Sequence, residues 1–212
     1  MWTRGGLSIK RGNKIHHITS EISETATIGE GVQVWQYSHI REDAILGAGT
    51  IIGRGVYIDA GVEIGNNCKV QNYSLIYAPA AVKDGVFIGP HVVLTNDHNP
   101  RAVTADGRRK SNLDWNQAKI SIGEGASIGA GAVCIAPLKI GKWALIGAGS
   151  VVNRDVPDFA LVVGNPAKQI GWVGHAGYRL VETEPGIFKC SRTSDEYILT
   201  SDNELRRIID ES

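Results

Sequence analysis

The sequence predicts an all-β protein built as a parallel β-helix, a coil of short strands joined by sharp corners. Two observations carry this prediction. An aliphatic residue occupies every sixth position over a long stretch, and a small residue follows most of these aliphatics four positions later. A period of six matches neither a helix nor a single long strand. The aliphatic series is Ile22, Ile28, Val34, Ile40, Leu46, Ile52, Ile58, Ile64, Val70, Ile76, Val82, Ile88 and Leu94.

Each six-residue unit has an assignable part in the coil. The aliphatic side chain is expected to point into a narrow core, and the small residue to sit where the chain turns and space is limited. Glycine follows the aliphatic directly in several units, where it allows turn conformations that a β-carbon would exclude. Three such units form one triangular coil of about 18 residues, which is stable only when stacked on its neighbours. These glycines are Gly29, Gly47, Gly53, Gly65 and Gly89.

One interruption divides the repeat. The phase is lost after Leu94 and resumes at Ile122, and the residues between 95 and 119 are polar and charged. A long loop that interrupts an otherwise regular fold commonly carries function. We therefore expect a single excursion loop, residues 95–119, that leaves the coil and contributes to a functional site.

The two ends depart from the repeat. Residues 1–17 hold several basic side chains and are expected to form a loose basic tail, because termini are commonly poorly ordered. The coil is expected to occupy residues 18–164 and a C-terminal extension residues 165–212. Within the extension, two strands around Glu184-Pro185-Gly186 predict a hairpin, and Ser201-Asp202-Asn203-Glu204 has the form of a capping box before a short helix.

Composition excludes several classes of function. The 212 residues contain 22 Lys and Arg against 22 Asp and Glu, which argues against a general nucleic-acid-binding or membrane-binding surface. No apolar run is long enough to span a bilayer. The three cysteines are scattered and form no metal-binding spacing, so we expect no metal and a reducing, cytoplasmic setting.

Several motifs, taken together, make the chain resemble the left-handed β-helix acyltransferases. The resemblance covers residues 20 to 175 and includes the hexapeptide pattern and the excursion. Within that family the motifs are similar to those of enzymes that N-acetylate nucleotide-activated amino sugars. The motifs are Val34-Trp35-Gln36-Tyr37-Ser38-His39-Ile40, Val70-Gln71-Asn72, Val86-Phe87-Ile88-Gly89-Pro90, Thr95-Asn96-Asp97-His98-Asn99-Pro100-Arg101, Gly164-Asn165-Pro166-Ala167-Lys168 and Ile170-Gly171-Trp172-Val173.

The resemblance implies an activity, a donor and an assembly. It implies an acetyl-CoA-dependent N-acetyltransferase acting on UDP-2-acetamido-3-amino-2,3-dideoxyglucuronate, a dTDP-3-amino-3,6-dideoxyhexose or a related nucleotide sugar, in lipopolysaccharide or other glycan synthesis. It also implies a left-handed coil and a homotrimer with active sites between subunits, and closed cyclic symmetry is common among oligomers.

Three residues are candidates for catalysis. Asn72 matches the asparagine that the family places beside the reacting amine, and an amide can both accept and donate. His98 opens the excursion and has the side chain best suited to act as a base near neutral pH. Asp97 could orient His98 or bind the amine. Each has a simpler interpretation, as a turn residue or as an exposed loop residue.

Substrate and CoA contacts are assigned by the same resemblance. Arg101 could pair with a carboxylate or phosphate, and Tyr77 lies where relatives carry a tyrosine followed by an acidic residue that this chain lacks. CoA contacts are expected at two alanines one coil apart, along which pantetheine would lie, and at polar residues near its adenine and phosphates. These are Ala130, Ala148, Asn153, Arg154 and Lys168.

Three other functions remain open on sequence grounds. A sugar O-acetyltransferase would need a base more strongly, because a hydroxyl is a weaker nucleophile than a neutral amine. A γ-type carbonic anhydrase would need three zinc-binding histidines, of which His91 and His98 are the nearest pair. A non-catalytic scaffold could use the same coil, because a fold does not by itself imply a function.

Overall fold

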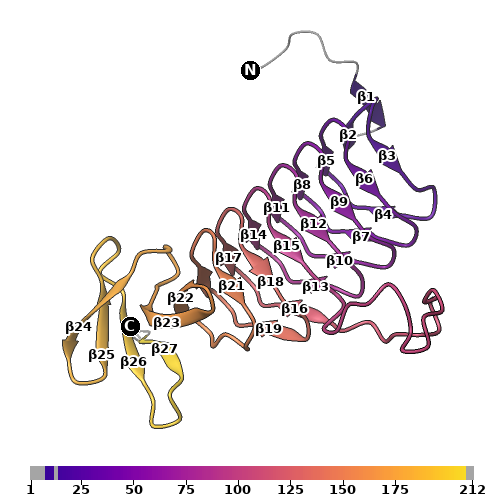
Figure 1. Ribbon diagram of the computed structural model, residues 1–212. Helices are drawn as coiled ribbons and strands as arrows, with labels where there is room; N and C mark the ends of the chain where they lie inside the picture. The colour runs from indigo at the N-terminus through magenta and orange to yellow at the C-terminus, as the bar shows by residue number, and fades with distance from the viewer. Residues whose placement is uncertain (1–7, 12–13, 209–212) are drawn as a thin grey trace.

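The computed structural model describes residues 8–11 and 14–208, and they form strands and turns with no helix. Most of the chain winds into a tapering coil of stacked rungs (Figure 1). Three parallel sheets run along the coil, and each coil contributes one short strand to each sheet. The predicted parallel β-helix is therefore confirmed, and its architecture is consistent with the left-handed β-helix. The described residues include no helix long and apolar enough to cross a membrane.

The ten-stranded sheet has the order β1-β2-β5-β8-β11-β14-β17-β20-β22-β23. Its outermost pairs, β1 with β2 and β22 with β23, are antiparallel, and the pairs between them are parallel. Its strands are β1 (Ser8–Arg11), β2 (Lys14–His17), β5 (Gln33–Val34), β8 (Ile51–Ile52), β11 (Lys69–Val70), β14 (Phe87–Ile88), β17 (Ser127–Ile128), β20 (Leu145–Ile146), β22 (Ala160–Gly164) and β23 (Ala167–Trp172).

Two further parallel sheets complete the triangular cross-section. The seven-stranded sheet consists of β3 (Glu21–Ile22), β6 (His39–Ile40), β9 (Tyr57–Ile58), β12 (Leu75–Ile76), β15 (Val93–Leu94), β18 (Val133–Cys134) and β21 (Val151–Val152). The six-stranded sheet consists of β4 (Thr27–Ile28), β7 (Ile45–Leu46), β10 (Glu63–Ile64), β13 (Ala81–Val82), β16 (Ile120–Ile122) and β19 (Leu138–Ile140).

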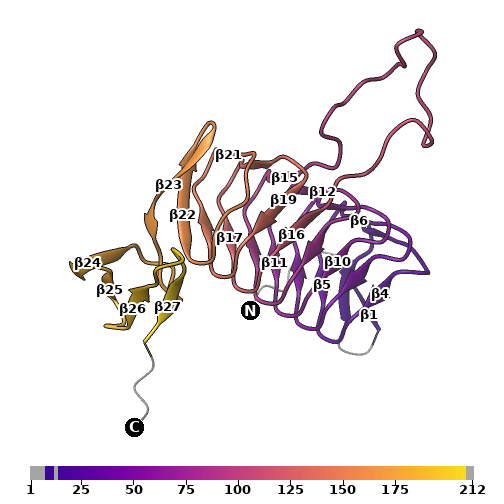
Figure 2. The same ribbon diagram turned by 90° about the horizontal axis from the view of Figure 1, so that it is seen from below.

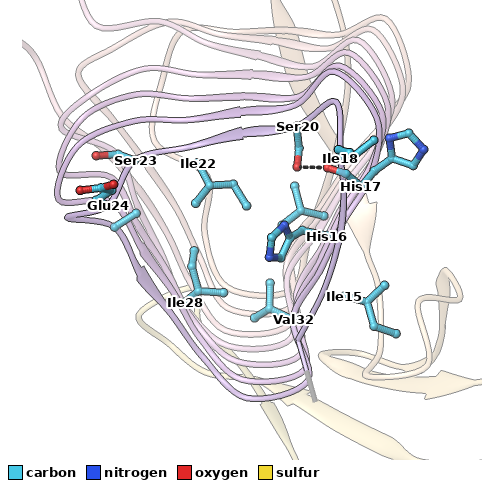
Figure 3. Close-up of a pocket in the computed structure, with 12 residues that line it drawn as sticks. Ile15, His16, His17, Ile18, Ser20, Ile22, Ser23, Glu24, Ile28 and Val32 are labelled. Carbon is cyan, nitrogen blue, oxygen red and sulfur yellow. Dashed lines mark hydrogen bonds between the residues drawn. The ribbon is translucent and has the colours of Figure 1, made fainter. Parts of the chain in front are cut away.

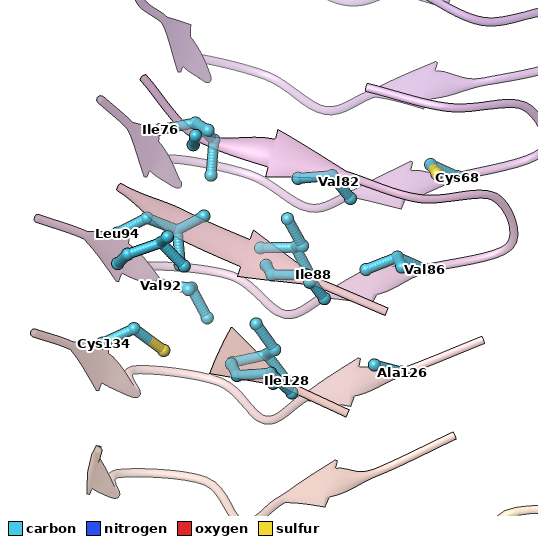
Figure 4. Packing of buried hydrophobic residues seen from close by; sticks show 14 of the residues in the cluster. Cys68, Ile76, Val82, Val86, Ile88, Val92, Leu94, Ala126, Ile128 and Cys134 are labelled. Carbon is cyan, nitrogen blue, oxygen red and sulfur yellow. The ribbon is translucent and has the colours of Figure 1, made fainter. Parts of the chain in front are cut away.

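Register explains the six-residue period. Glu63 pairs with Ala81 and Lys69 with Phe87, in each case 18 residues further along the chain. The second residue of each two-residue strand points inward, so the aliphatics of successive coils stack in columns and fill the core (Figure 4). Small or polar residues fill the corners, and the polar ones are hydrogen-bonded: the buried Thr50 hydroxyl donates to the Gly65 carbonyl over 2.8 Å and accepts from the Cys68 N–H.

The excursion, which we call the arm (residues 95–119), lies where the sequence predicts it. β15 ends at Leu94 and β16 begins at Ile120. Val82 pairs with Ile122, 40 residues on rather than 18, so the arm lengthens one coil by 22 residues without shifting the register. The arm projects away from the coil (Figure 2) and has local structure of its own, an antiparallel bridge between Val103 and Arg109 and an Arg108–Asp114 ion pair.

The N-terminal end of the coil differs from the expected loose tail. Residues 8–11 and 14–17 form β1 and β2, and β2 pairs in parallel with β5. Beneath this hairpin lies a hollow of about 480 Å³ at the open end of the core, with Ile22, Ile28 and Val32 on its walls (Figure 3). The predicted loose tail is therefore wrong for these residues, because β2 pairs with the edge strand β5 of the ten-stranded sheet.

The C-terminal extension first adds β23 to the ten-stranded sheet and then forms a separate four-stranded antiparallel sheet. That sheet consists of β24 (Leu180–Glu184), β25 (Ile187–Cys190), β26 (Glu196–Leu199) and β27 (Leu205–Arg207). The predicted hairpin is present as β24 and β25. The predicted short helix is wrong: residues 200–204 form a turn, and Leu205 begins a strand paired with β26. Burial of Leu205 and pairing with β26 outweigh a capping signal for a helix too short to be stable alone.

An aromatic cluster joins this sheet to the last coils. The His175 ring packs against Trp143, Phe159 and Tyr197, with ring centroids 4.7, 5.0 and 5.9 Å away. The His175 backbone N–H donates to the buried Tyr197 hydroxyl over 3.0 Å. This packing ends the coil and fixes the extension against it.

The two faces of one strand give a direct test of the packing. Ile88 is fully buried, whereas the adjacent Phe87 on β14 points outward and is 39% exposed. We expect Ile88→Ala to lower the free energy of unfolding by about 2–5 kcal/mol, because it leaves a cavity in a column that cannot collapse. Phe87→Ala should cost less than about 1 kcal/mol. Urea unfolding of both variants would measure the difference, and equal losses would contradict the inward column.

Candidate active site

Two corners of the coil carry the candidate residues. The asparagine corner joins the ten-stranded to the seven-stranded sheet and comprises residues 35–38, 53–56, 71–74, 89–92, 129–132 and 147–150. The arm corner joins the seven-stranded to the six-stranded sheet and comprises residues 41–44, 59–62, 77–80, the arm, 135–137 and 153–155. The two corners border opposite edges of the seven-stranded sheet.

Asn72 lies on the asparagine corner, and half of its side chain is used structurally. Its Oδ1 accepts the Arg54 N–H of the preceding coil over 2.9 Å. Asn66 and Asp84 make the same bond at another corner, to the N–H groups of Ala48 and Asn66. The Asn72 Nδ2 group has no partner among the described residues, so it is available to donate a hydrogen bond to a ligand.

In its last two coils, residues 129–132 and 147–150, the same corner carries only glycine, alanine and serine. Ala130 and Ala148 are exposed and stacked one coil apart, with the Gly149 N–H donating to the Ala130 carbonyl over 2.8 Å. Lys168, on β23, is exposed opposite Val163 in the hairpin that extends the ten-stranded sheet beyond this corner. The structure thus aligns three of the predicted CoA contacts with Asn72.

His98 lies at the base of the arm on the other corner. Its Nδ1 is 3.0 Å from the Ala136 carbonyl oxygen, which can only accept, so Nδ1 carries the proton and the neutral ring has its lone pair on Nε2. Neighbouring bonds hold the base of the arm in place: Asn96 donates to the Ala78 carbonyl over 2.8 Å, and the Ala118 N–H donates to the Asn96 carbonyl. His98 is therefore presented by an anchored segment.

The remaining candidates on the arm corner are less constrained. Asp97 accepts the Asn99 N–H over 2.9 Å, which is a turn contact, and within the described part of the chain it forms no hydrogen bond or ion pair with His98. Arg101 is exposed and donates to the adjacent Pro100 carbonyl. Asn153 and Arg154 are exposed at the arm corner of the last coil, away from the line of Ala130, Ala148 and Lys168. Tyr77 is half-buried.

A charged cluster above Tyr77 was not found from sequence. Asp59 accepts from the Tyr57 hydroxyl over 2.9 Å and from Arg41 over 3.1 Å, and Tyr57 packs against Tyr77 with centroids 5.5 Å apart. Arg41, Asp59 and Tyr77 are spaced 18 residues apart, so the coil period itself places them on one column. The 18-residue spacing is therefore the feature of the sequence that could have identified this cluster.

The Asp59 carboxyl is held ionised. Burial acts to raise its pKa, but hydrogen bonds from the N–H groups of Ala60 and Ala78, from Tyr57 and from Arg41 outweigh burial, and the net pKa lies below the usual aspartate value. Its side chain is 13% exposed. The cluster therefore braces the upper part of the arm corner next to Tyr77.

The outer face of the seven-stranded sheet separates the two corners. Its outward side chains in four successive coils are apolar and in register, with Leu75 beside Val93, Val93 beside Val133, and Val133 beside Val151. Within one chain, Asn72 and His98 thus border opposite edges of an apolar strip. No group of three or more His, Cys, Asp or Glu residues in the described part of the chain could hold a metal ion.

Asp59 gives a prediction with a definite pH dependence. Because the folded-state pKa is lowered, the carboxylate stabilises the fold in full above the unfolded-state pKa of about 3.9, and this contribution is lost as pH falls through the lower folded-state value. Asp59→Asn should lower the free energy of unfolding by about 1–3 kcal/mol at pH 7. The difference from wild type should shrink below about pH 4, and a constant difference in urea unfolding would contradict the assignment.

Comparisons with known proteins agree with the coil. The model for the bacterial transferase hexapeptide (six repeats) matches residues 25–60 and 61–96, and the model for the hexapeptide repeat of succinyl-transferase matches 119–154. The bifunctional protein GlmU of Jannaschia sp. is 34% identical over 153 residues, which are 71% of this chain and 33% of that protein. The chain thus spans about a third of the length of the curated relatives it matches.

A likeness in fold extends to one solved acyltransferase structure. UDP-N-acetylglucosamine acyltransferase of Francisella novicida superposes with a TM-score of 0.55 at 16% identity, over 76% of this chain and 70% of that one. PerB of Caulobacter crescentus, solved with CoA and GDP-perosamine, is 27% identical with a TM-score of 0.43, over 74% of this chain and 57% of that one. With the repeat models matching about half of the chain, the protein belongs to the hexapeptide-repeat acyltransferases.

Proposed function

We propose that this protein is an acetyl-CoA-dependent N-acetyltransferase that acts on an amino group of a nucleotide-linked amino sugar, in the synthesis of lipopolysaccharide or another surface glycan. The observation that carries the proposal is the alignment of Asn72 with Ala130 and Ala148 along one exposed corner, with Lys168 on the hairpin just beyond it. The motif resemblance supports the choice of an amine acceptor. The three cysteines are free, which fits a reducing cytoplasm.

The corner suits the acetyl donor. Pantetheine would lie along the bare backbone at Ala130 and Ala148, where small side chains permit close approach. Lys168 would meet a CoA phosphate at the C-terminal end of this line. Asn153 and Arg154 lie on the arm corner, so their contact with CoA requires that another subunit place its arm corner beside this asparagine corner.

The chemistry is aminolysis of a thioester. The lone pair of the neutral amine forms a bond to the acetyl carbon, the carbonyl becomes an oxyanion, and the C–S bond then breaks to release CoA thiolate. The amine loses one proton, which passes to His98 Nε2 or to the leaving sulfur. The Asn72 Nδ2 group would donate to the oxyanion or to the substrate, and holding both reactants in place supplies a further part of the acceleration. Arg101, Tyr77 and Asp97 would face the acceptor.

A homotrimer would complete this site. Asn72 and His98 border opposite edges of one sheet, so a single chain cannot bring them to one acetyl group. Packing the apolar strip of Leu75, Val93, Val133 and Val151 against a second copy would bury it and bring one copy's asparagine corner beside the next copy's arm corner. The site would then lie between subunits.

Mixing of two inactive variants tests the shared site. Asn72→Asp keeps a side-chain oxygen that can accept the Arg54 N–H, just as the Asp84 carboxylate accepts the Asn66 N–H. The substitution removes the amide donor. His98→Ala removes the base. We expect each variant alone to lose at least tenfold in kcat, and a remixed pair to recover about a quarter of wild-type activity, because random assembly restores that fraction of sites. Remixing is measured after reversible dissociation, and an inactive mixture would contradict a site between chains.

O-acetyl transfer is the second candidate. The observation in its favour is the fixed His98 tautomer, which leaves Nε2 as the acceptor that a hydroxyl nucleophile would need. With a hydroxyl acceptor, His98→Ala should lower kcat/KM about 10²–10⁴-fold. With an amine acceptor, which is the better nucleophile, the loss should stay at about tenfold, the lower limit given for the mixing experiment. Thiol release from acetyl-CoA, measured with matched amino and hydroxy nucleotide sugars, distinguishes the two reactions.

A further inference from the structure

The upper part of the asparagine corner contains a hollow of which the site assignments above use only Asn72. It measures about 280 Å³ and is lined by Trp35, Gln36, Ile51, Gly53, Arg54, Gln71 and Asn72. Trp35, Gly53 and Gln71 occupy the same corner position in three successive coils, 18 residues apart. The middle position is glycine because a Cβ there would lie 2.7 Å from the Asn72 N and Oδ1 atoms, so no side chain fills the space between the other two.

Several polar groups around this hollow have hydrogen-bonding capacity that the described part of the fold does not use. The Arg54 guanidinium lies 5.0 Å from the centroid of the Tyr37 ring and forms no ion pair with an acid among the described residues, whereas Arg41 is paired with Asp59 and Glu42. The side-chain amides of Gln36 and Gln71 form no hydrogen bond within the described part of the chain. Trp35 is 46% exposed, so part of its indole ring is accessible to a ligand.

The order of these groups along the corner matches the order of groups in a nucleotide sugar. Asn72 lies at the proposed acceptor amine, Arg54 is one coil above it, and Trp35 is one coil above Arg54, each step being about 4.8 Å. A cation on a rigid support suits a diphosphate. An exposed indole suits the face of a base, and free amides suit its polar edge.

We propose that Arg54 and Trp35 bind the nucleoside diphosphate of the acceptor, with Arg54 on the diphosphate and Trp35 stacked on the base. Gln36 and Gln71 donate to and accept from polar groups of the same ligand. This assignment rests on the proposed function, because it takes Asn72 as the place of the reacting amine. It makes Arg54 and Trp35 binding residues of the acceptor and leaves CoA on the lower corner.

A diphosphate joined to a base is also present in CoA, so the experiment must separate the two ligands. UDP, dTDP, GDP, the matching nucleosides and CoA are titrated calorimetrically into the full chain and into Arg54→Ala, Arg54→Lys and Trp35→Ala. Arg192→Ala and Phe87→Ala serve as matched controls, since Arg192 lies in the turn between β25 and β26 and Phe87 points outward from β14. Thermal melts establish that each variant is folded.

We expect one nucleoside diphosphate to bind wild type more tightly than its nucleoside. Arg54→Ala should weaken the diphosphate roughly tenfold to a hundredfold and remove its advantage over the nucleoside, and Arg54→Lys should restore part of it. Trp35→Ala should weaken nucleoside and diphosphate alike by roughly tenfold. CoA affinity should be unchanged in every variant, and the controls should behave as wild type.

Three results would overturn the assignment: no nucleoside diphosphate binds wild type, Arg54→Ala binds it as wild type does, or the variants weaken CoA instead. Acetyl-transfer assays separate this failure from failure of the proposed function. If transfer occurs but KM for the acceptor is unchanged in both variants, the subsite is wrong and the function stands. If the binding pattern is found but no nucleotide amino sugar is acetylated, the subsite stands and the N-acetyltransferase function is wrong.

Discussion

The backbone ladder between coils is the interaction on which the rest of this structure depends. Each two-residue strand is too short to be stable alone, and it persists because its N–H and C=O groups bond to equivalent residues 18 positions away. The ladder fixes which side chains stack in a column. It puts the aliphatic side chains inside the coil. At each corner position it stacks one residue from every coil, so residues 18 apart in the sequence become neighbours on the surface.

The same constraint explains why so much of the fold could be predicted. The columns of Ile76, Leu94 and their equivalents follow directly from the period, and the arm is visible as a loss of phase between Leu94 and Ile122. The ends could not be predicted in this way. Residues 14–17 are ordered by pairing with β5, and Leu205 by pairing with β26, and neither partner is identifiable from local sequence.

The candidate site was predictable only in part. Alignment of Ala130 with Ala148 follows from their 18-residue spacing, and so does the column of Arg41, Asp59 and Tyr77. The relation between Asn72 and His98 does not follow from spacing, because it depends on which edge of the seven-stranded sheet each one borders. The structure shows that Asn72 Oδ1 accepts a backbone N–H from the preceding coil whereas its Nδ2 has no partner among the described residues, a division that residue type alone cannot reveal.

The arm leaves and rejoins the coil at one corner, and the strands on either side keep their pairing across it: Val93 pairs with Val133, and Val82 with Ile122. Its length is therefore decoupled from the integrity of the core, and enlarging such a loop costs only a slowly growing closure entropy. A lineage built on this coil can lengthen, shorten or exchange that segment without repacking a single aliphatic column. The side chains that this segment presents can then change faster than the scaffold that carries it.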